Sequence, residues 1–199
     1  MILTDPERQA VLLSLKVSSL AVALSLPFGI FFAWLLVRCR FPGKALLDSV
    51  LHLPLVLPAF SWRGAVLAAA VMSFPLMVRA IRLALEGVDM KLEQAARTLG
   101  AGRWRVFFTI TLPLTLPGII VGTVLAFARS LGEFGATITF VSNIPGETRT
   151  IPSAMYTLIQ TPGGEGAAAR LCIISIVLAL ASLMVSEWLA RLSRQRMGK

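Results

Sequence analysis

Histidine and cysteine are scarce in this chain of 199 residues, which has one histidine and two cysteines. His52 has no second histidine, cysteine or glutamate at ligand spacing, so the sequence predicts no metal site. It also lacks the companions of a catalytic set, so we predict no catalytic residues and no enzyme. Cys39 and Cys172 are too few and too far apart for a disulfide framework, and we expect them to pack as small hydrophobes.

Charged residues make up only 15% of the chain and hydrophobic residues 56%, which excludes an ordinary soluble domain. The formal net charge is nevertheless +9. The basic residues cluster between apolar runs rather than across one face, so membrane lipids, and no nucleic acid, are the expected partners. No Gly-x-x-x-x-Gly-Lys-Ser/Thr sequence is present, so we expect neither a nucleotide site nor another cofactor.

Five apolar runs come close to the ~20 residues that a membrane-spanning helix needs. They predict one all-α polytopic helix bundle over residues 1–199, with spans at residues 17–37, 45–60, 65–85, 107–128 and 171–190. The second run would reach only ~24 Å at ~1.5 Å per residue, less than the ~30 Å hydrocarbon core. Asp5, Glu7 and the length of the first run argue against a cleaved signal peptide, so we expect the first helix to remain as an anchor.

The basic residues fall into three clusters: Arg38, Arg40 and Lys44; Arg79, Arg82, Lys91, Arg97, Arg103 and Arg105; and Arg191, Arg194, Arg196 and Lys199. With five crossings all three clusters lie on one side of the membrane, which the positive-inside rule identifies as the cytoplasm. The amino terminus is then expected outside, in the periplasm, and the carboxyl terminus inside.

A polar helix is predicted over residues 88–99, within a cytoplasmic loop at about residues 86–106. Leu92, Ala95, Ala96 and Leu99 form one apolar stripe at helical spacing. Asp89 can cap the start, and Gly100 permits a left-handed turn at the end. An amphipathic helix lying on the membrane surface remains an alternative.

Two further segments carry candidate functional residues. Arg129 and Glu133 are four residues apart and can pair on a helix, at a point where Gly132 and Gly135 permit a break. Ionisable groups in a membrane segment usually face the bundle interior or an aqueous path, although a pair that only ties two helices together is the alternative. The second segment is an outer loop at about residues 142–166, with a short helix at 152–160; an ordinary connecting loop is the other interpretation.

The segment from Gln94-Ala95-Ala96 through Gly100 to Ile110-x-Leu112-Pro113 resembles the EAA signature of ABC-importer membrane subunits, which usually has Glu where this chain has Gln94. The resemblance implies that the polar helix docks in a groove of a dimer of ATPase subunits, which hydrolyse ATP. It assigns ATPase coupling to Glu93, Gln94, Ala95, Ala96, Gly100, Ile110, Leu112 and Pro113.

The Leu-Gly-Glu-Phe-Gly-Ala-Thr stretch ending at Thr137 is similar to permeases for molybdate, tungstate and sulfate, and the whole chain resembles molybdate ABC transporter permease subunits. The resemblance implies a homodimer in the bacterial inner membrane. It gives as candidates for the translocation path Arg129, Ser130, Gly132, Glu133 and Thr137. It gives as candidates for contact with a periplasmic oxyanion-binding protein Thr148, Arg149, Thr150 and Tyr156. Sulfate and tungstate remain alternative substrates.

One departure from the family follows Pro58, where a longer helix and an outer loop are expected and the chain passes directly to Ala59. This indicates an internal deletion, so a membrane scaffold that does not transport is a further alternative. A secondary transporter or channel would predict symmetric repeats or broken helices in matching halves, and none is found. A membrane enzyme should place several histidines or acids at one membrane face, and the sequence lacks them.

Overall fold

The computed structural model describes residues 4–38 and 61–197, which are mostly helical. Its helices are α1 (Asp5–Arg38), α3 (Trp62–Glu86), α4 (Met90–Thr98), α5 (Arg103–Val106), the π-helix η1 (Phe107–Thr111), α6 (Leu112–Leu131), the π-helix η2 (Thr137–Val141), α7 (Ile151–Ile159) and α8 (Glu165–Met197). The predicted all-α class is confirmed.

Within the described residues, four helical rods are long and apolar enough to cross a membrane. They are Asp5–Arg38, Trp62–Glu86, Arg103–Leu131 and Glu165–Leu192. Each contains one of the predicted apolar runs and extends beyond it at both ends. The span predicted at residues 45–60, and the deletion predicted after Pro58, lie outside the described residues.

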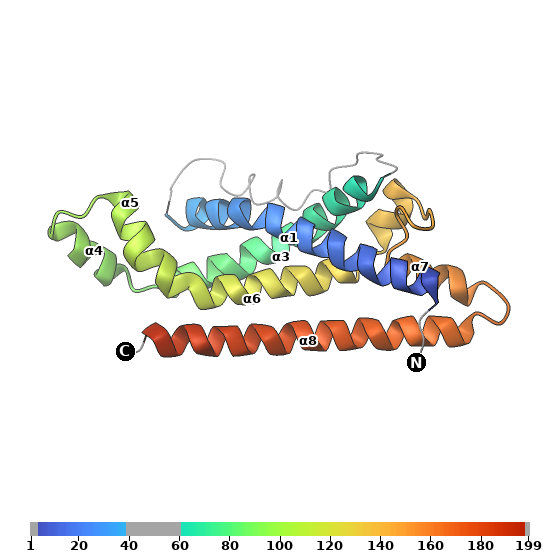
Figure 1. Ribbon diagram of the computed structural model, residues 1–199. Coiled ribbons are helices and arrows are strands. Elements are labelled where there is room, and N and C mark those ends of the chain that lie inside the picture. Colours follow the sequence, from blue (N-terminus) through green and yellow to red (C-terminus); the bar gives the residue numbers. More distant parts are fainter. Residues whose placement is uncertain (1–3, 39–60, 198–199) are drawn as a thin grey trace.

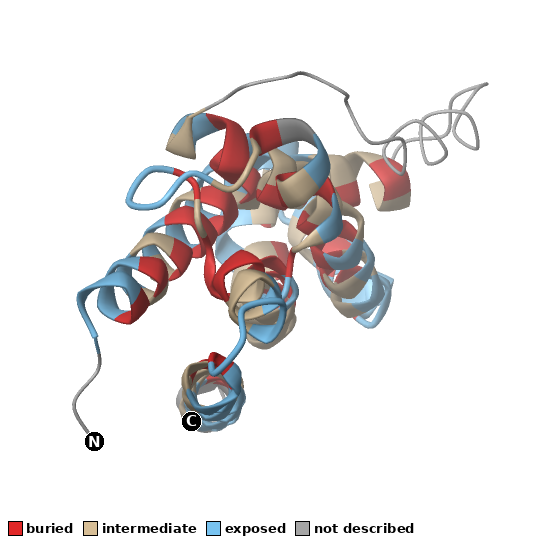
Figure 2. Cartoon of the chain, turned by 90° about the vertical axis from the view of Figure 1, so that its right-hand side faces the viewer, coloured by how far each residue is buried: buried red, intermediate tan, exposed pale blue. Residues whose placement is uncertain are grey.

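The rods lie side by side along one long axis (Figure 1). Helices α1 and α3 run in the same direction, toward the end of the bundle that carries α4, and α6 returns from that end. The carboxyl end lies at the α4 end, whereas the amino end lies near α7 at the opposite end. Helix α8 lies at the edge of the bundle, against α6 and α7, and much of its outward surface is exposed (Figure 2). The exposed positions between Ile173 and Val185 are apolar and suit contact with lipid chains.

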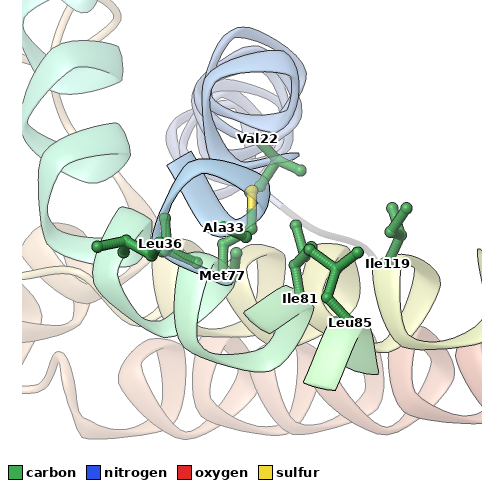
Figure 3. Packing of buried hydrophobic residues seen from close by; sticks show 9 residues of the cluster. Val22, Ala33, Leu36, Met77, Ile81, Leu85 and Ile119 are labelled. Atoms are coloured by element: carbon green, nitrogen blue, oxygen red, sulfur yellow. The ribbon is translucent and has the colours of Figure 1, made fainter. Parts of the chain in front are cut away.

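Close packing of α1, α3 and α6 forms the centre of the bundle. Leu36, Met77 and Ile81 are fully buried in its main apolar cluster (Figure 3). Gly118 lets α6 approach α3, because a Cβ added there would lie 2.0 Å from the Cβ of Ala84. Small residues at helix contacts are the usual means of close packing in membranes, where backbones gain contact only by near approach.

The π-helix η1 ends at Thr111, two residues before Pro113 in the first turn of α6. Proline has no N–H to donate to the preceding turn, and its ring crowds the carbonyl four residues earlier. A local π turn accommodates this interruption while the rod continues from Arg103 to Leu131.

Candidate functional site

Helix α4 forms at one end of the bundle as the sequence predicts. The Asp89 carboxylate accepts a hydrogen bond from the Lys91 N–H at 2.8 Å and so caps the first turn. At the other end Gly100 has a φ of +84°, a left-handed conformation that favours glycine. The N–H of Ala101 then donates to the carbonyl of Ala96 at 3.1 Å, which ends the helix. The predicted helix, its cap and its terminating turn are confirmed.

The apolar stripe of α4 points away from the described chain. Leu99 is 88% exposed and Leu92 49% exposed. Ala95 is also exposed, and Ala96 is half-buried. Large exposed apolar side chains beside small ones form a surface that another molecule can approach closely. The docking role of Gln94, which is exposed on the same helix, stays a prediction.

Glu93 points the opposite way, into the bundle. It is 4% exposed, forms an ion pair with Arg38 at the end of α1, and accepts a hydrogen bond from the Thr111 hydroxyl at 2.8 Å. This carboxylate therefore ties α4 to both α1 and η1. Sequence reasoning grouped Glu93 with the docking residues and missed this contact, because Arg38 lies 55 residues away along the chain.

The last motif positions shape the helix that follows the loop. Ile110 lies in η1, and Leu112 and Pro113 open α6. All three are half-buried, and Leu112 packs against the main apolar cluster. Their location gives them a clear local role in directing the chain from the loop into the membrane. A role in ATPase coupling stays a prediction.

An aromatic column lies beside α4. The ring of Trp104 stacks on Trp34 of α1 with centroids 5.9 Å apart, and on Phe108 at 6.4 Å. Trp104 is 65% exposed and Phe108 58% exposed, and the basic residues Arg103 and Arg105 flank Trp104. Amphipathic rings beside basic groups are typical of the membrane–water interface.

The second predicted constellation lies at the far end of α6. Helix α6 ends at Leu131, and Arg129 pairs with Glu133 at 2.8 Å. Glu133 is buried, and its other carboxylate oxygen accepts from the Ala136 N–H at 2.9 Å. The predicted pair and helix break are confirmed, and the carboxylate holds the chain as it turns into η2.

The remaining candidates of this constellation differ in exposure. Ser130 and Thr137 are buried, whereas Gly132 is exposed. Among the described residues no hydrogen-bond partner lies near the buried Ser130 hydroxyl. Lining of the translocation path by these residues stays a prediction.

The outer-loop candidates divide into inner and outer side chains. Thr148 is fully buried, accepts from the Ile144 N–H at 2.8 Å and thereby shapes the loop. Thr150 is buried just before α7. Arg149 is partly exposed, and Tyr156 is 47% exposed. Arg149 and Tyr156 are therefore the more accessible to a partner, although such contact stays a prediction for all four.

A further ion pair at this end was missed by sequence reasoning. Glu7 of α1 is buried and pairs with Arg170 of α8 at 2.8 Å, across 163 residues of sequence. The Ser14 hydroxyl accepts from the Ile151 N–H at 2.7 Å and joins α1 to α7. In the sequence, Glu7 is recognisable only as an acidic residue close to an apolar run, which does not identify its partner.

Residues 17–199 match the family described as the inner membrane component of binding-protein-dependent transport systems. The chain belongs to this family. It is a membrane-embedded transport component, which agrees with its apolar helical rods.

Relatives extend the match over the whole chain. The molybdenum transport system permease protein ModB of Escherichia coli K12 is 80% identical, with all of both chains covered. The protein of that name from Haemophilus influenzae is 55% identical over 97% of each chain. The sulfate transport system permease protein CysT of E. coli is 34% identical over 79% of this chain and 66% of its own length. The sulfate relative is thus the more distant.

The alignment with the E. coli molybdenum permease protein runs over 229 positions, whereas this chain has 199 residues, so about 30 positions of the relative have no counterpart here. The predicted shortening of the chain agrees with this difference in length. Among solved structures, a bacterial alginate ABC transporter bound to a periplasmic protein carrying an alginate pentasaccharide matches with a TM-score of 0.74. It is 18% identical over 94% of this chain and 79% of the other, and therefore shows the fold alone.

Proposed function

We propose that this chain is the membrane-spanning subunit of an ATP-driven importer for molybdate. The observation that carries the proposal is 80% identity along the full length of a molybdenum transport permease, against 34% to a sulfate permease. This difference in sequence identity favours molybdate over sulfate, which is also a tetrahedral oxyanion.

Helix α4 is proposed as the contact through which an ATPase subunit drives transport. It offers exposed Leu92 and Leu99 beside small alanines, and its Gly100 turn leads directly into the membrane rod that begins at Arg103. Movement of α4 would be passed to α1 and η1 through the buried Glu93 contacts. ATP hydrolysis belongs to the partner in this proposal.

The assembly proposed around this chain has two copies of the permease, two ATPase subunits and a periplasmic oxyanion-binding protein. Arg129, Ser130, Gly132, Glu133 and Thr137 are proposed for the translocation path between the copies. The loop around Arg149 and Tyr156 is proposed to receive the binding protein. The amino terminus then faces the periplasm of the bacterial inner membrane, and α4 and the carboxyl terminus face the cytoplasm.

The test is uptake of labelled molybdate into vesicles that contain the permease, with the ATPase subunit, the binding protein and ATP supplied. We expect ATP-dependent uptake that excess unlabelled molybdate suppresses strongly and equal sulfate suppresses weakly. Stronger competition by sulfate would reassign the substrate, and uptake without ATPase would exclude an importer of this type.

A second candidate function is a membrane scaffold that assembles with its partners but does not transport. The specific observation in its favour is the absence of about 30 positions that the full-length relative possesses. The two candidates differ in one measurement, because both predict association with the ATPase and only the importer predicts uptake.

A further inference from the structure

A cavity of about 230 Å³ lies where α4 meets the end of α1 and the start of the α5–η1 rod. A single water needs only about 10–15 Å³ of such space, so the cavity has room for a much larger group. Arg38, Arg97 and Arg103 line it, together with Glu93 and Gln94. It is therefore a cationic cavity built from three separate helices.

The charge of the cavity is not balanced by the described chain. Glu93 is the acid that lines it, and this carboxylate is already paired with Arg38. Within residues 4–38 and 61–197, no ion pair joins Arg97 or Arg103 to a carboxylate. Gln94 adds amide hydrogen-bonding groups but no charge. Two guanidinium groups thus remain available to an anion from outside, and their planar forks suit phosphate oxygens.

Aromatic side chains border the cavity, as they commonly do where lipid headgroups meet a membrane protein. Trp34 and Phe107 line it. The ring of Phe107 contacts Trp34 and Phe108, so both lining rings adjoin the aromatic column, whose Trp104 and Phe108 rings are exposed. An anion held by the arginines would therefore lie beside an exposed apolar surface that leads onto the membrane rod. A free inorganic ion has no apolar part that would contact that surface, whereas a phospholipid can place its acyl chains along it.

We propose that this cavity binds the phosphate headgroup of an anionic phospholipid, through Arg97 and Arg103, with the acyl chains against Trp104 and Phe108. Basic pockets at the cytoplasmic side of membrane helices commonly hold such headgroups. The bound lipid would stabilise the packing of α4 against the end of α1 and the start of α5. The inference depends on the chain being a membrane component, which the family match gives, and on the proposed cytoplasmic location of α4, but not on the transported anion.

The test measures lipids retained by the purified full-length chain in native mass spectrometry, with phosphatidylglycerol and phosphatidylcholine added separately. We expect phosphatidylglycerol to bind, and the R97Q/R103Q variant to bind it about tenfold more weakly or worse. The matched control, K91Q/R105Q, removes the same charge from the same loop outside the cavity and should keep the binding. The R97K/R103K variant should restore part of it, which separates lost charge from lost folding.

Several outcomes would overturn the proposal. Equal phosphatidylglycerol binding by R97Q/R103Q and by the unaltered chain would show that the lipid lies elsewhere, as would equal loss in K91Q/R105Q. Displacement of the lipid by millimolar inorganic phosphate or molybdate would assign the cavity to a free oxyanion. Release of the lipid when the ATPase subunit binds would assign the arginines to that protein contact. Failure of molybdate uptake alone would leave lipid binding intact, so the two proposals fail separately.

Discussion

Glu93 in the middle of α4 forms a buried ion pair with Arg38, the last residue of α1, across 55 residues of sequence. Their side chains are 6% and 12% exposed, respectively. The Thr111 hydroxyl donates to the same carboxylate oxygen at 2.8 Å. One side chain of the polar helix thus joins the ends of two membrane rods.

Replacing Glu93 by alanine should destabilise the protein by about 3 kcal/mol or more, because it leaves the Arg38 charge buried without its partner. The measurement is thermal or denaturant unfolding of the purified protein in detergent. Glu86→Gln is the matched control, since its pair with Arg82 is 46% and 34% exposed and should be worth less than about 1 kcal/mol. Equal effects from the two variants would contradict a special role for the buried pair.

Gly118→Ala should separate α3 from α6. The new methyl group would lie 2.0 Å from the Cβ of Ala84, which a helix can avoid only by moving its backbone. Overpacking of this kind costs about 1–3 kcal/mol, and Gly118→Leu should cost more. Unfolding in detergent measures the loss. Gly166→Ala serves as control, because a Cβ there meets no atom within 4 Å and should leave stability unchanged or slightly higher.

Gly100→Val should weaken association with the ATPase by about tenfold and uncouple ATP hydrolysis from uptake. Valine at a φ of +84° is strained by about 1–2 kcal/mol, so the chain after α4 must take another direction. Ala96→Trp should act similarly by blocking close approach to α4. Co-purification and the ratio of molybdate taken up to ATP hydrolysed report both effects.

Gly102→Ala in the same loop is the control, since its φ is −66° and no atom lies within 4 Å of the added methyl. Normal co-purification and uptake by Gly100→Val and Ala96→Trp would refute the docking role of α4.

The carboxyl terminus should face the cytoplasm and the amino terminus the periplasm. The positive-inside rule gives this orientation, and the carboxyl end lies at the same end of the bundle as α4, so the two are expected on one side of the membrane (Figure 1). A reporter active only in the cytoplasm should therefore work when fused after Lys199. Activity of a periplasm-specific reporter at that position would instead show that the carboxyl terminus faces the periplasm.

Restoring the family's segment between Pro58 and Ala59 should raise ATP-dependent molybdate uptake severalfold while membrane insertion changes little. The run at residues 45–60 is short for the hydrocarbon core and contains two prolines, so a full crossing there carries a mismatch cost. Uptake, dimerisation and ATPase co-purification are compared for both forms in the same vesicles. Equal uptake would show that the absent segment is dispensable.

Local sequence signals predicted much of the fold. Four of the five predicted apolar runs lie within the four described rods, and the Asp89 cap and Gly100 turn set the ends of α4 at the expected places. The Arg129–Glu133 pair was also predictable, because the two residues are one helical turn apart. Each of these features depends on neighbours within a few residues, so the sequence itself contains the relevant spacing.

Contacts between distant helices could not be predicted in this way. The partners Glu93 and Arg38, or Glu7 and Arg170, meet only after the helices pack, and no periodicity in one segment specifies the other. The inward direction of Glu93 was hidden for the same reason, since the exposed stripe on α4 gives no information on its opposite face. The charge of the cavity beside α4 likewise depends on three helices at once.

The π-helix before Pro113 lies between two sets of contacts, so the number of residues in this segment matters as well as their side chains. Each residue of an α-helix adds about 100° of rotation, and each residue of a wider π turn adds somewhat less. Removing one residue from the π turn between Trp104 and Thr111 would therefore turn Trp104 away from Trp34 while Thr111 stayed beside Glu93. Inserting one residue would rotate Trp104 in the opposite direction. The stretch between Gly100 and Pro113 therefore sets the angle between the Trp104 contact and the Thr111 contact, and a change of one residue in its length would keep only one of the two.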